Sequence, residues 1–262
     1  KFFDILIEAG TWRKAWIIMA AFLLIVYVPL LILFFRDNPQ GLGMKPDGKL
    51  NQKSGNKRKP AQFVASRHFS LTEARRTREY WLFTLVIALL GLFFTGFSLN
   101  FESIFESQGL TKELALRMFI LVGVVSVIFQ FFANWLSDFV SLRYYLPVST
   151  FVIVINLLSV PYIEDGNLFY YVFILSTGMN NAFFGIYTAI TWPRLFGTKH
   201  LGEISGSAIG VAVIASAAGP LLMSLSLRYT QSYDLSFYFC AAIALLLFFF
   251  SFTARHERAI GK

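Results

Sequence analysis

Long apolar stretches separated by short polar connections run along most of the chain. A transmembrane helix needs ~20 consecutive apolar residues to cross the ~30 Å of hydrocarbon in a bilayer. Seven stretches approach or exceed that length, at 15–35, 81–101, 117–136, 144–163, 168–190, 204–226 and 234–254. They are continuously apolar rather than alternating, which favours helices over the strands of a membrane barrel. The pattern therefore predicts an all-α polytopic membrane protein with seven transmembrane helices.

The composition excludes several other classes of protein. Of the 262 residues, 56% are hydrophobic and 15% are charged, against ~25% charged in soluble domains. Disordered, collagen-like and coiled-coil chains are excluded on the same grounds. The lone Cys240 excludes a disulfide framework and a cysteine-based metal cluster. His68, His200 and His256 all fall outside the predicted spans, so we expect no enzymatic activity, no metal site and no cofactor.

The basic residues predict how the chain is oriented. The segment 36–79 holds nearly half of the 23 Lys and Arg residues, which places it in the cytoplasm by the positive-inside rule. Alternation then puts 137–143, 191–203 and the tail 255–262 on the same side. We expect a multi-pass protein of the plasma (inner) membrane, with the linker and the C-terminus cytoplasmic. The same rule explains the net charge of +8 without a nucleic-acid partner.

The chain divides into four predicted segments. They are an outer lead-in with one helix (1–35), a basic cytoplasmic linker (36–79), a six-helix bundle (80–254) and a cytoplasmic tail (255–262). Glycines and prolines predict that 45–60 is flexible. Ser70 and Glu73 have the spacing of a capping box, which predicts a short helix at the end of the linker. Two interpretations stay open: the arginines of this helix lie near anionic headgroups, or the segment is a solvated linker.

Two features concern the ends and the helix contacts. The predicted orientation places the start of the first of seven helices outside the cell, and residues 1–14 have neither an initiator Met nor the layout of a signal peptide. Two interpretations stay open: upstream helices are missing, or this is a seven-helix protein with an outside N-terminus. The residues Gly206, Gly210, Ala217, Ala218 and Gly219 form a small-residue face, which predicts close packing against another helix.

Four local motifs carry a resemblance to the major facilitator superfamily of secondary transporters. The motifs are Gly10-Thr11-Trp12-Arg13-Lys14-Ala15; the run from Arg36 through Pro39 and Gly43 to Pro46-Asp47-Gly48; Asn134-Trp135-Leu136-Ser137-Asp138 with Arg143; and Arg194-Leu195-Phe196-Gly197 with Gly202, Gly206, Gly210 and Gly219-Pro220. The third resembles the G-x-L-x-D-x-x-G-R-K loop motif, with both glycines replaced. The fourth resembles carboxylate-transporting branches, so an organic-anion type is expected. The resemblance implies a sixth helix, a central linker and a C-terminal six-helix half, preceded by an N-terminal helical bundle.

The loop motif suggests a gate. Its short connection makes the helices 117–136 and 144–163 antiparallel neighbours, with Asp138 just before the second helix, where an anion is favoured. Arg143 is close enough in sequence to pair with Asp138. In the family such a cluster closes the cytoplasmic side and breaks as the two halves rock. The alternative is an ordinary surface pair worth ~0–1 kcal/mol.

Polar residues inside the spans are candidate substrate-binding residues, because they are costly at membrane depth. They are Asn180, Asn181, Gln130, Asn100 and Tyr187, with Asn156 as a further candidate. Amides both donate and accept, so they suit carboxylate, amide or hydroxyl groups. The alternative is interhelical hydrogen bonding at ~0.6 kcal/mol per contact.

Charge at membrane depth is scarce. Gln130 stands where the monocarboxylate branch of the family has a substrate-binding arginine, so the resemblance implies that a fixed positive charge would come from the N-terminal half. Glu102, at the rim of its helix, is the nearest carboxylate and the candidate for ion coupling. Because a rim carboxylate is more often solvated, we expect coupling not to be carried by this half.

Together these patterns predict a secondary active or facilitative transporter of a small solute, an organic anion or another metabolite, working by alternating access. Its expected partners are the solute, membrane lipids and an N-terminal helical bundle. The alternative is a seven-helix membrane receptor with an extracellular N-terminus. The long first inner loop and the lack of a cysteine pair in the outer loops argue against that alternative.

Overall fold

The computed structural model describes residues 11–34, 65 and 67–254. Every regular element within these ranges is a helix, which confirms the all-α class. The chain divides into two units, Lys1–Arg58 and Lys59–Lys262, and the division falls within the predicted linker. The predicted flexible stretch 45–60 and the motif from Arg36 to Gly48 lie outside the described residues.

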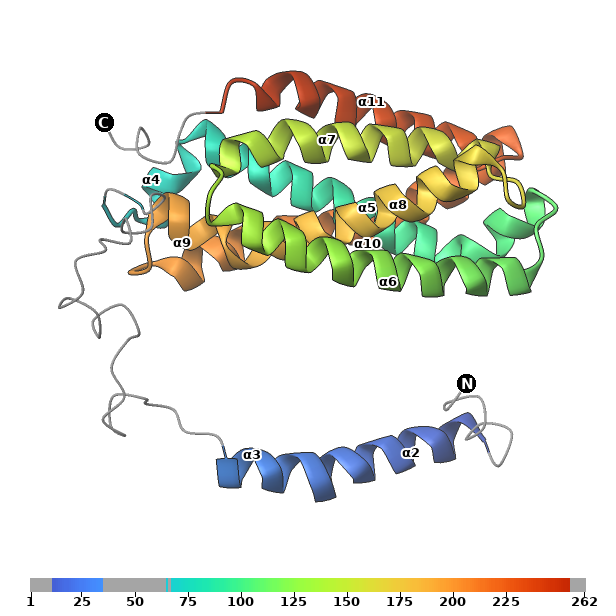
Figure 1. Cartoon of the computed structure of the whole chain (residues 1–262), viewed down its shortest axis with the longest axis horizontal. Helices are drawn as coiled ribbons and strands as arrows, with labels where there is room; N and C mark the ends of the chain where they lie inside the picture. The colour runs from blue at the N-terminus through green and yellow to red at the C-terminus, as the bar shows by residue number, and fades with distance from the viewer. Residues whose placement is uncertain (1–10, 35–64, 66, 255–262) are drawn as a thin grey trace. The chain divides into compact units, whose positions relative to one another are not determined.

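The first unit contains one long helix in three consecutive pieces (Figure 1), α2 (Trp12–Phe22), the π-helical turn η1 (Leu23–Tyr27) and α3 (Val28–Phe34). Thr11 begins the helix, because its side chain accepts a hydrogen bond from the Lys14 N–H at 3.5 Å. The π turn lies just before Pro29, which has no amide hydrogen to continue the regular pattern. The piece Trp12–Leu33 is long and apolar enough to cross a membrane, as predicted for 15–35.

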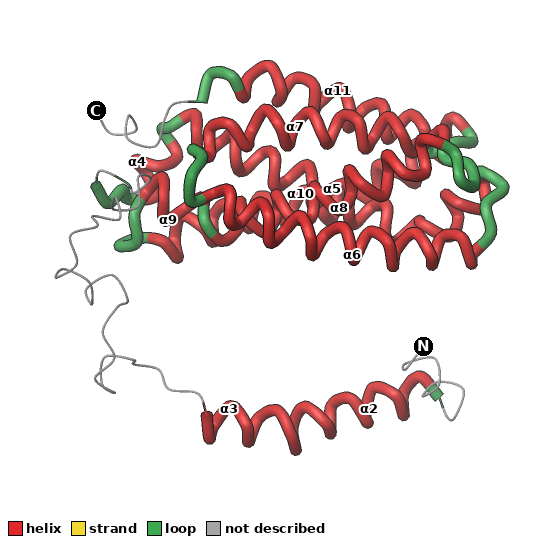
Figure 2. The backbone as a smooth tube through the Cα atoms, in the orientation of Figure 1, coloured by secondary structure: helices red, strands yellow, loops and turns green. Residues whose placement is uncertain are grey.

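The second unit is a bundle of long helices in which consecutive long helices run in opposite directions (Figure 2). These are α5 (Arg78–Ser107), α6 (Lys112–Ser137), α7 (Leu142–Ser159) with the 3-10 turn η4 (Val160–Tyr162), α8 (Leu168–Ala189), α10 (Leu201–Thr230) and α11 (Asp234–Ser251). The short helices α4 (Leu71–Arg75) and α9 (Thr191–Phe196) lie together at one end. The most extensive helix pairs are α5 with α10, α6 with α8, and α7 with α11 and α8.

The number of membrane-crossing helices differs from the prediction by one. Six of the helices that the structure describes are long and apolar enough to cross a membrane, against seven expected. The seventh, α8, forms over Leu168–Ala189 as predicted and has 22 residues, but it is not among the six. The adjacent amides of Asn180 and Asn181 lower the hydropathy of this helix, and both side chains border the cavity described below.

Glycine lets α5 and α10 cross in backbone contact. A Cβ atom on Gly219 would lie 2.1 Å from the Leu92 carbonyl oxygen, and a Cβ atom on Gly96 would lie 3.0 Å from Gly219. The predicted small-residue face is therefore used in packing at Gly219. At Gly206 and Gly210 no described atom lies within 4 Å of such a Cβ atom, so that part of the predicted face is open in the bundle.

The end of the linker folds against the bundle as a capped turn. Ser70 and Glu73 form the predicted capping box, with the Ser70 backbone N–H donating to Glu73 Oε2 at 2.8 Å. This N–H, the Ser70 hydroxyl and the Arg67 guanidinium hold the pKa of the Glu73 carboxyl below its ordinary value of 4.5. Further along the chain, the Thr198 N–H donates to His68 Nδ1 at 3.2 Å, beside the positive φ of Gly197.

Charge is distributed unevenly between the two ends of the bundle. We call the basic end the one where α5 and α10 begin and α6 and α11 finish; α4 and α9 lie there (Figure 1). It holds Arg67, Arg75, Arg76, Arg78, Arg143, Arg194 and Lys199, against the acidic residues Glu73, Glu79, Asp138 and Glu203. The opposite end holds Glu102, Glu106, Glu113, Glu164, Asp165 and Asp234, together with Arg117 and Arg228. This separation follows the alternation that the sequence predicts.

Candidate functional site

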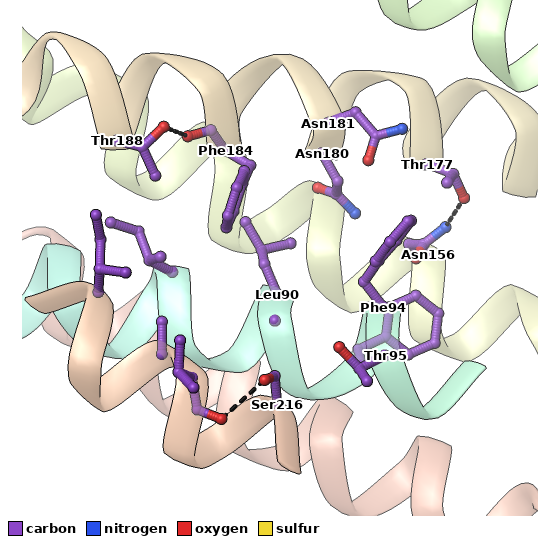
Figure 3. A pocket seen from close by; sticks show the side chains of 16 residues that line it. Leu90, Phe94, Thr95, Asn156, Thr177, Asn180, Asn181, Phe184, Thr188 and Ser216 are labelled. Atoms are coloured by element: carbon purple, nitrogen blue, oxygen red, sulfur yellow. Dashed lines mark hydrogen bonds between the residues drawn. The ribbon is translucent and has the colours of Figure 1, made fainter. Parts of the chain in front are cut away.

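A cavity of about 460 Å³ lies between α5, α8 and α10, about halfway along the bundle (Figure 3). One face of α8 forms its polar wall, with Thr177, Asn180, Asn181, Phe184 and Thr188. Their spacing is that of a single helical stripe. The sequence prediction included only the asparagine pair of this stripe, although the helical period of its threonines is itself a readable signal.

The remaining walls are mostly apolar. The α5 helix contributes Leu90, Gly91 and Phe94, and α10 contributes Val213 and Ser216. Asp, Glu, Lys, Arg and His are all absent from the residues that line the cavity. The lining therefore offers neutral hydrogen-bonding groups and apolar surface to whatever enters the cavity.

Asn156 of α7 lines the cavity, and only the nitrogen of its side-chain amide is hydrogen-bonded. Its Nδ2 donates to Ser176 Oγ and to Thr177 Oγ1, both at 2.8 Å. Ser176 donates its own hydroxyl proton to the Val172 carbonyl oxygen at 2.6 Å, so its oxygen accepts from Asn156. The Asn156 Oδ1 atom is left buried without a hydrogen-bond partner in the described part of the chain.

Asn180 presents a second acceptor of the same kind. Its side chain is buried, and its Oδ1 has no hydrogen-bond partner among the described atoms. The neighbouring Asn181 is engaged, because its Nδ2 donates to Ser126 Oγ of α6 at 3.0 Å. Figure 3 shows the three amides on the same side of the cavity. A buried acceptor without a partner costs about 1–3 kcal/mol, so the wall favours a ligand with O–H or N–H donors.

A second, smaller cavity continues from the first. It has a volume of about 220 Å³ and shares Phe93, Phe94, Thr177 and Asn181 with the first cavity. Its other walls are largely aromatic, including Phe105 near the acidic end of α5. The two cavities together follow α5 from Ile87 to Phe105, away from the basic end.

Three of the predicted substrate-binding residues lie outside the lining of the main cavity. The Gln130 amide packs over Gly185, where an added Cβ would lie 2.6 Å from its Nε2. The Asn100 amide donates to the Gly96 carbonyl oxygen of its own helix at 2.9 Å. Tyr187 is fully buried, with its hydroxyl 2.5 Å from Ser149 Oγ. The contacts of Gln130 and Tyr187 join neighbouring helices, whereas that of Asn100 stays within α5. Glu102, the candidate for ion coupling, has an exposed side chain in the half of α5 that lies away from the basic end.

Asp138 does not pair with Arg143, as predicted, but with a different arginine. Asp138 Oδ1 lies 3.3 Å from Nη2 of Arg194, which α9 brings to the same loop. Arg194 also donates to the Ser137 carbonyl oxygen at 2.6 Å, one of the carbonyl groups that the end of α6 leaves unpaired. Arg143 instead lies over the ring of Tyr144 and contacts its hydroxyl. The pairing prediction was therefore wrong, and the loop motif and the Arg194 motif meet at one cluster.

Comparison with known proteins agrees with the all-α membrane fold. The model of the Major Facilitator Superfamily matches residues 3–220 of the chain, and the chain belongs to this superfamily of membrane transporters. It is accordingly an integral, multi-pass membrane protein, and a transporter family fits the expectation of a non-enzyme. The match gives no support to the receptor alternative and does not distinguish a carboxylate-transporting branch. No curated protein matches the chain.

Proposed function

We propose that this transporter moves a small uncharged solute with hydroxyl or amide donors, and that the cavity between α5, α8 and α10 holds it. The observation that carries the proposal is the pair of buried acceptors, Asn156 Oδ1 and Asn180 Oδ1, in a cavity lined by no charged side chain. A volume of about 460 Å³ suits a small metabolite.

The two acceptors favour a neutral solute over an anion. A carboxylate carries acceptors only, so it would face Asn156 Oδ1 and Asn180 Oδ1 without a proton to share. An organic anion, which the sequence resemblance suggests, would need a cation supplied from outside this lining. A solute with O–H or N–H donors would supply the protons that both oxygens lack, while Phe94 and Phe184 cover its apolar side.

The transport cycle we propose is alternating access, in which this bundle rocks against a second helical bundle around the solute. The basic end would face the cytoplasm, because basic residues gather on that side of membrane proteins. The Asp138–Arg194 contact lies at that end and would hold the loop between α6 and α7 while the cytoplasmic side is closed. Glu102 is exposed, so any dependence of transport on pH should persist in the Glu102→Gln variant.

Uptake into proteoliposomes tests the proposal. The chain is reconstituted together with the second helical bundle that the proposed cycle needs, and it is supplied with labelled polyols, amides, carboxylates and organic cations in parallel. We expect uptake of a neutral hydroxylated solute, reduced at least about tenfold in Asn180→Leu, which removes the acceptor from the wall. Ser107→Ala removes an exposed polar group at the far end of α5, outside the cavity lining, and should leave uptake unchanged. Uptake confined to carboxylates, and unaffected by Asn180→Leu, would contradict the proposal.

A further inference from the structure

A third pocket, separate from the two cavities described above, lies at the basic end between the start of α5 and the end of α11. Its volume is about 680 Å³. Arg75, Arg76, Arg78 and Trp81 line it from one side, and Leu247 and Phe250 line it from α11. None of these residues borders the cavity between α5, α8 and α10.

The mouth of this pocket is strongly cationic. Arg75, Arg76 and Arg78 are all exposed. Arg75 is partly engaged, since its Nη2 donates to Ser207 Oγ of α10 at 2.6 Å. Within the described ranges, neither Arg76 nor Arg78 forms an ion pair with an acidic side chain. Their guanidinium groups therefore remain available to bind an anion in the fork geometry that suits phosphate.

Below the arginines the pocket becomes apolar. Leu82 and Leu247 are buried and form its floor, whereas Leu85 and Phe250 are exposed along its walls. Trp81 lies between the two zones, and its Nε1 donates to the Arg75 carbonyl oxygen at 2.8 Å. Tryptophan in this position is typical of the boundary between headgroups and hydrocarbon. The order of cationic, aromatic and apolar groups is that of an amphiphile with an anionic head.

We propose that this pocket binds one anionic phospholipid from the leaflet at the basic end. The phosphate would bind Arg76 and Arg78, and an acyl chain would lie along Leu85 and Phe250. A basic pocket between transmembrane helices suits lipid headgroups because it combines charge with access from the bilayer. A soluble phosphate would use the arginines but leave the apolar walls without an occupant, which favours the lipid. The bound lipid would link the junction of α4 and α5 to α11. This proposal does not depend on which solute the cavity carries.

Native mass spectrometry of the 262-residue chain tests this inference. The protein is released from detergent micelles that contain phosphatidylglycerol and phosphatidylcholine at equal concentration. We expect one retained phosphatidylglycerol molecule in preference to phosphatidylcholine. Arg76→Gln and Arg78→Gln should each weaken that retention about fivefold, the effect of one basic residue near a membrane surface. Arg78→Lys, which keeps the charge, should retain most of the binding.

Lys199→Gln is the matched control, because Lys199 is exposed at the same end, outside the pocket lining, and its loss changes the charge equally. Retention should be unchanged in this variant. The proposal is overturned if wild-type protein shows no preference for phosphatidylglycerol, or if Lys199→Gln weakens binding as much as Arg78→Gln. It is also overturned if glycerol phosphate, which has no acyl chain, competes as well as the intact lipid. The preference of the wild-type protein decides the matter even if a variant fails to fold.

Discussion

Arg194 of α9 lies across the end of α6, where its guanidinium is 3.3 Å from Asp138 Oδ1 and 2.6 Å from the Ser137 carbonyl oxygen. The Arg194 side chain is only 16% exposed, whereas Asp138 is 72% exposed. The contact to the carbonyl oxygen is therefore the better shielded of the two.

This difference predicts unequal effects of removing the two partners. Arg194→Gln should destabilise the protein by about 2 kcal/mol, the scale of a hydrogen bond to a charged group. Asp138→Asn should cost less than about 1 kcal/mol, as for an exposed ion pair. Urea unfolding in detergent measures both, with Arg143→Gln as the control, since the hydrogen bond and the ring contact of Arg143 in the described structure are both to its neighbour Tyr144. An effect of Arg143→Gln as large as that of Arg194→Gln would restore the pairing expected from the sequence.

The crossing of α5 and α10 predicts opposite effects of two glycine substitutions in the same helix. Gly219→Ala would place a Cβ atom 2.1 Å from the Leu92 carbonyl oxygen, so the helices must separate, at a cost of about 1–3 kcal/mol. Gly206→Ala meets no described atom within 4 Å and should be neutral or stabilising by up to about 1 kcal/mol through helix propensity. Thermal unfolding of the two variants checks this contrast. Equal melting temperatures would contradict the close crossing.

The two adjacent asparagines of α8 should respond differently to the same substitution. Asn180→Leu removes a buried acceptor without a partner and should raise stability by about 1 kcal/mol or more. Asn181→Leu removes the 3.0 Å hydrogen bond to Ser126 and should lower stability by about 0.6 kcal/mol. A gain in stability at Asn180 together with a loss of uptake would mark it as a residue kept for binding. A loss of stability at Asn180 would show that its oxygen has a structural partner.

The Glu73 capping box predicts a defined dependence of stability on pH. The Ser70 N–H, the Ser70 hydroxyl and Arg67 favour the charged carboxylate and lower its pKa from 4.5. The stabilisation is therefore present above pH 4.5 and is lost as pH falls through the lowered pKa. Unfolding of wild type and Glu73→Gln should differ at neutral pH and converge in acid. A difference that grows as the pH falls would contradict the assigned sign.

The sequence was a good guide to the helices and a weaker guide to the contacts between them. Continuous apolar stretches predicted all seven helical ranges, because lipid leaves the backbone no other partner. The capping box was equally readable, since Ser70 and Glu73 are local to each other. The partner of Asp138 was not, because Arg194 lies 56 residues away and only the fold brings α9 to that loop. Likewise, no local pattern shows that Tyr187 faces Ser149 whereas Asn180 faces the cavity.

Access of water to the cavity can be measured by thiol labelling in the membrane. Cys240 is the only cysteine in the chain and is buried, so a Cys240→Ala background accepts single new cysteines. Ser216→Cys lies in the cavity lining, whereas Leu246→Cys lies on an exposed face of α11 outside it. A charged, membrane-impermeant thiol reagent should label Ser216→Cys from the aqueous phase, more slowly in the presence of the transported solute, and leave Leu246→Cys unmodified. Failure to label Ser216→Cys, or equal labelling of both positions, would contradict a solute cavity between α5, α8 and α10.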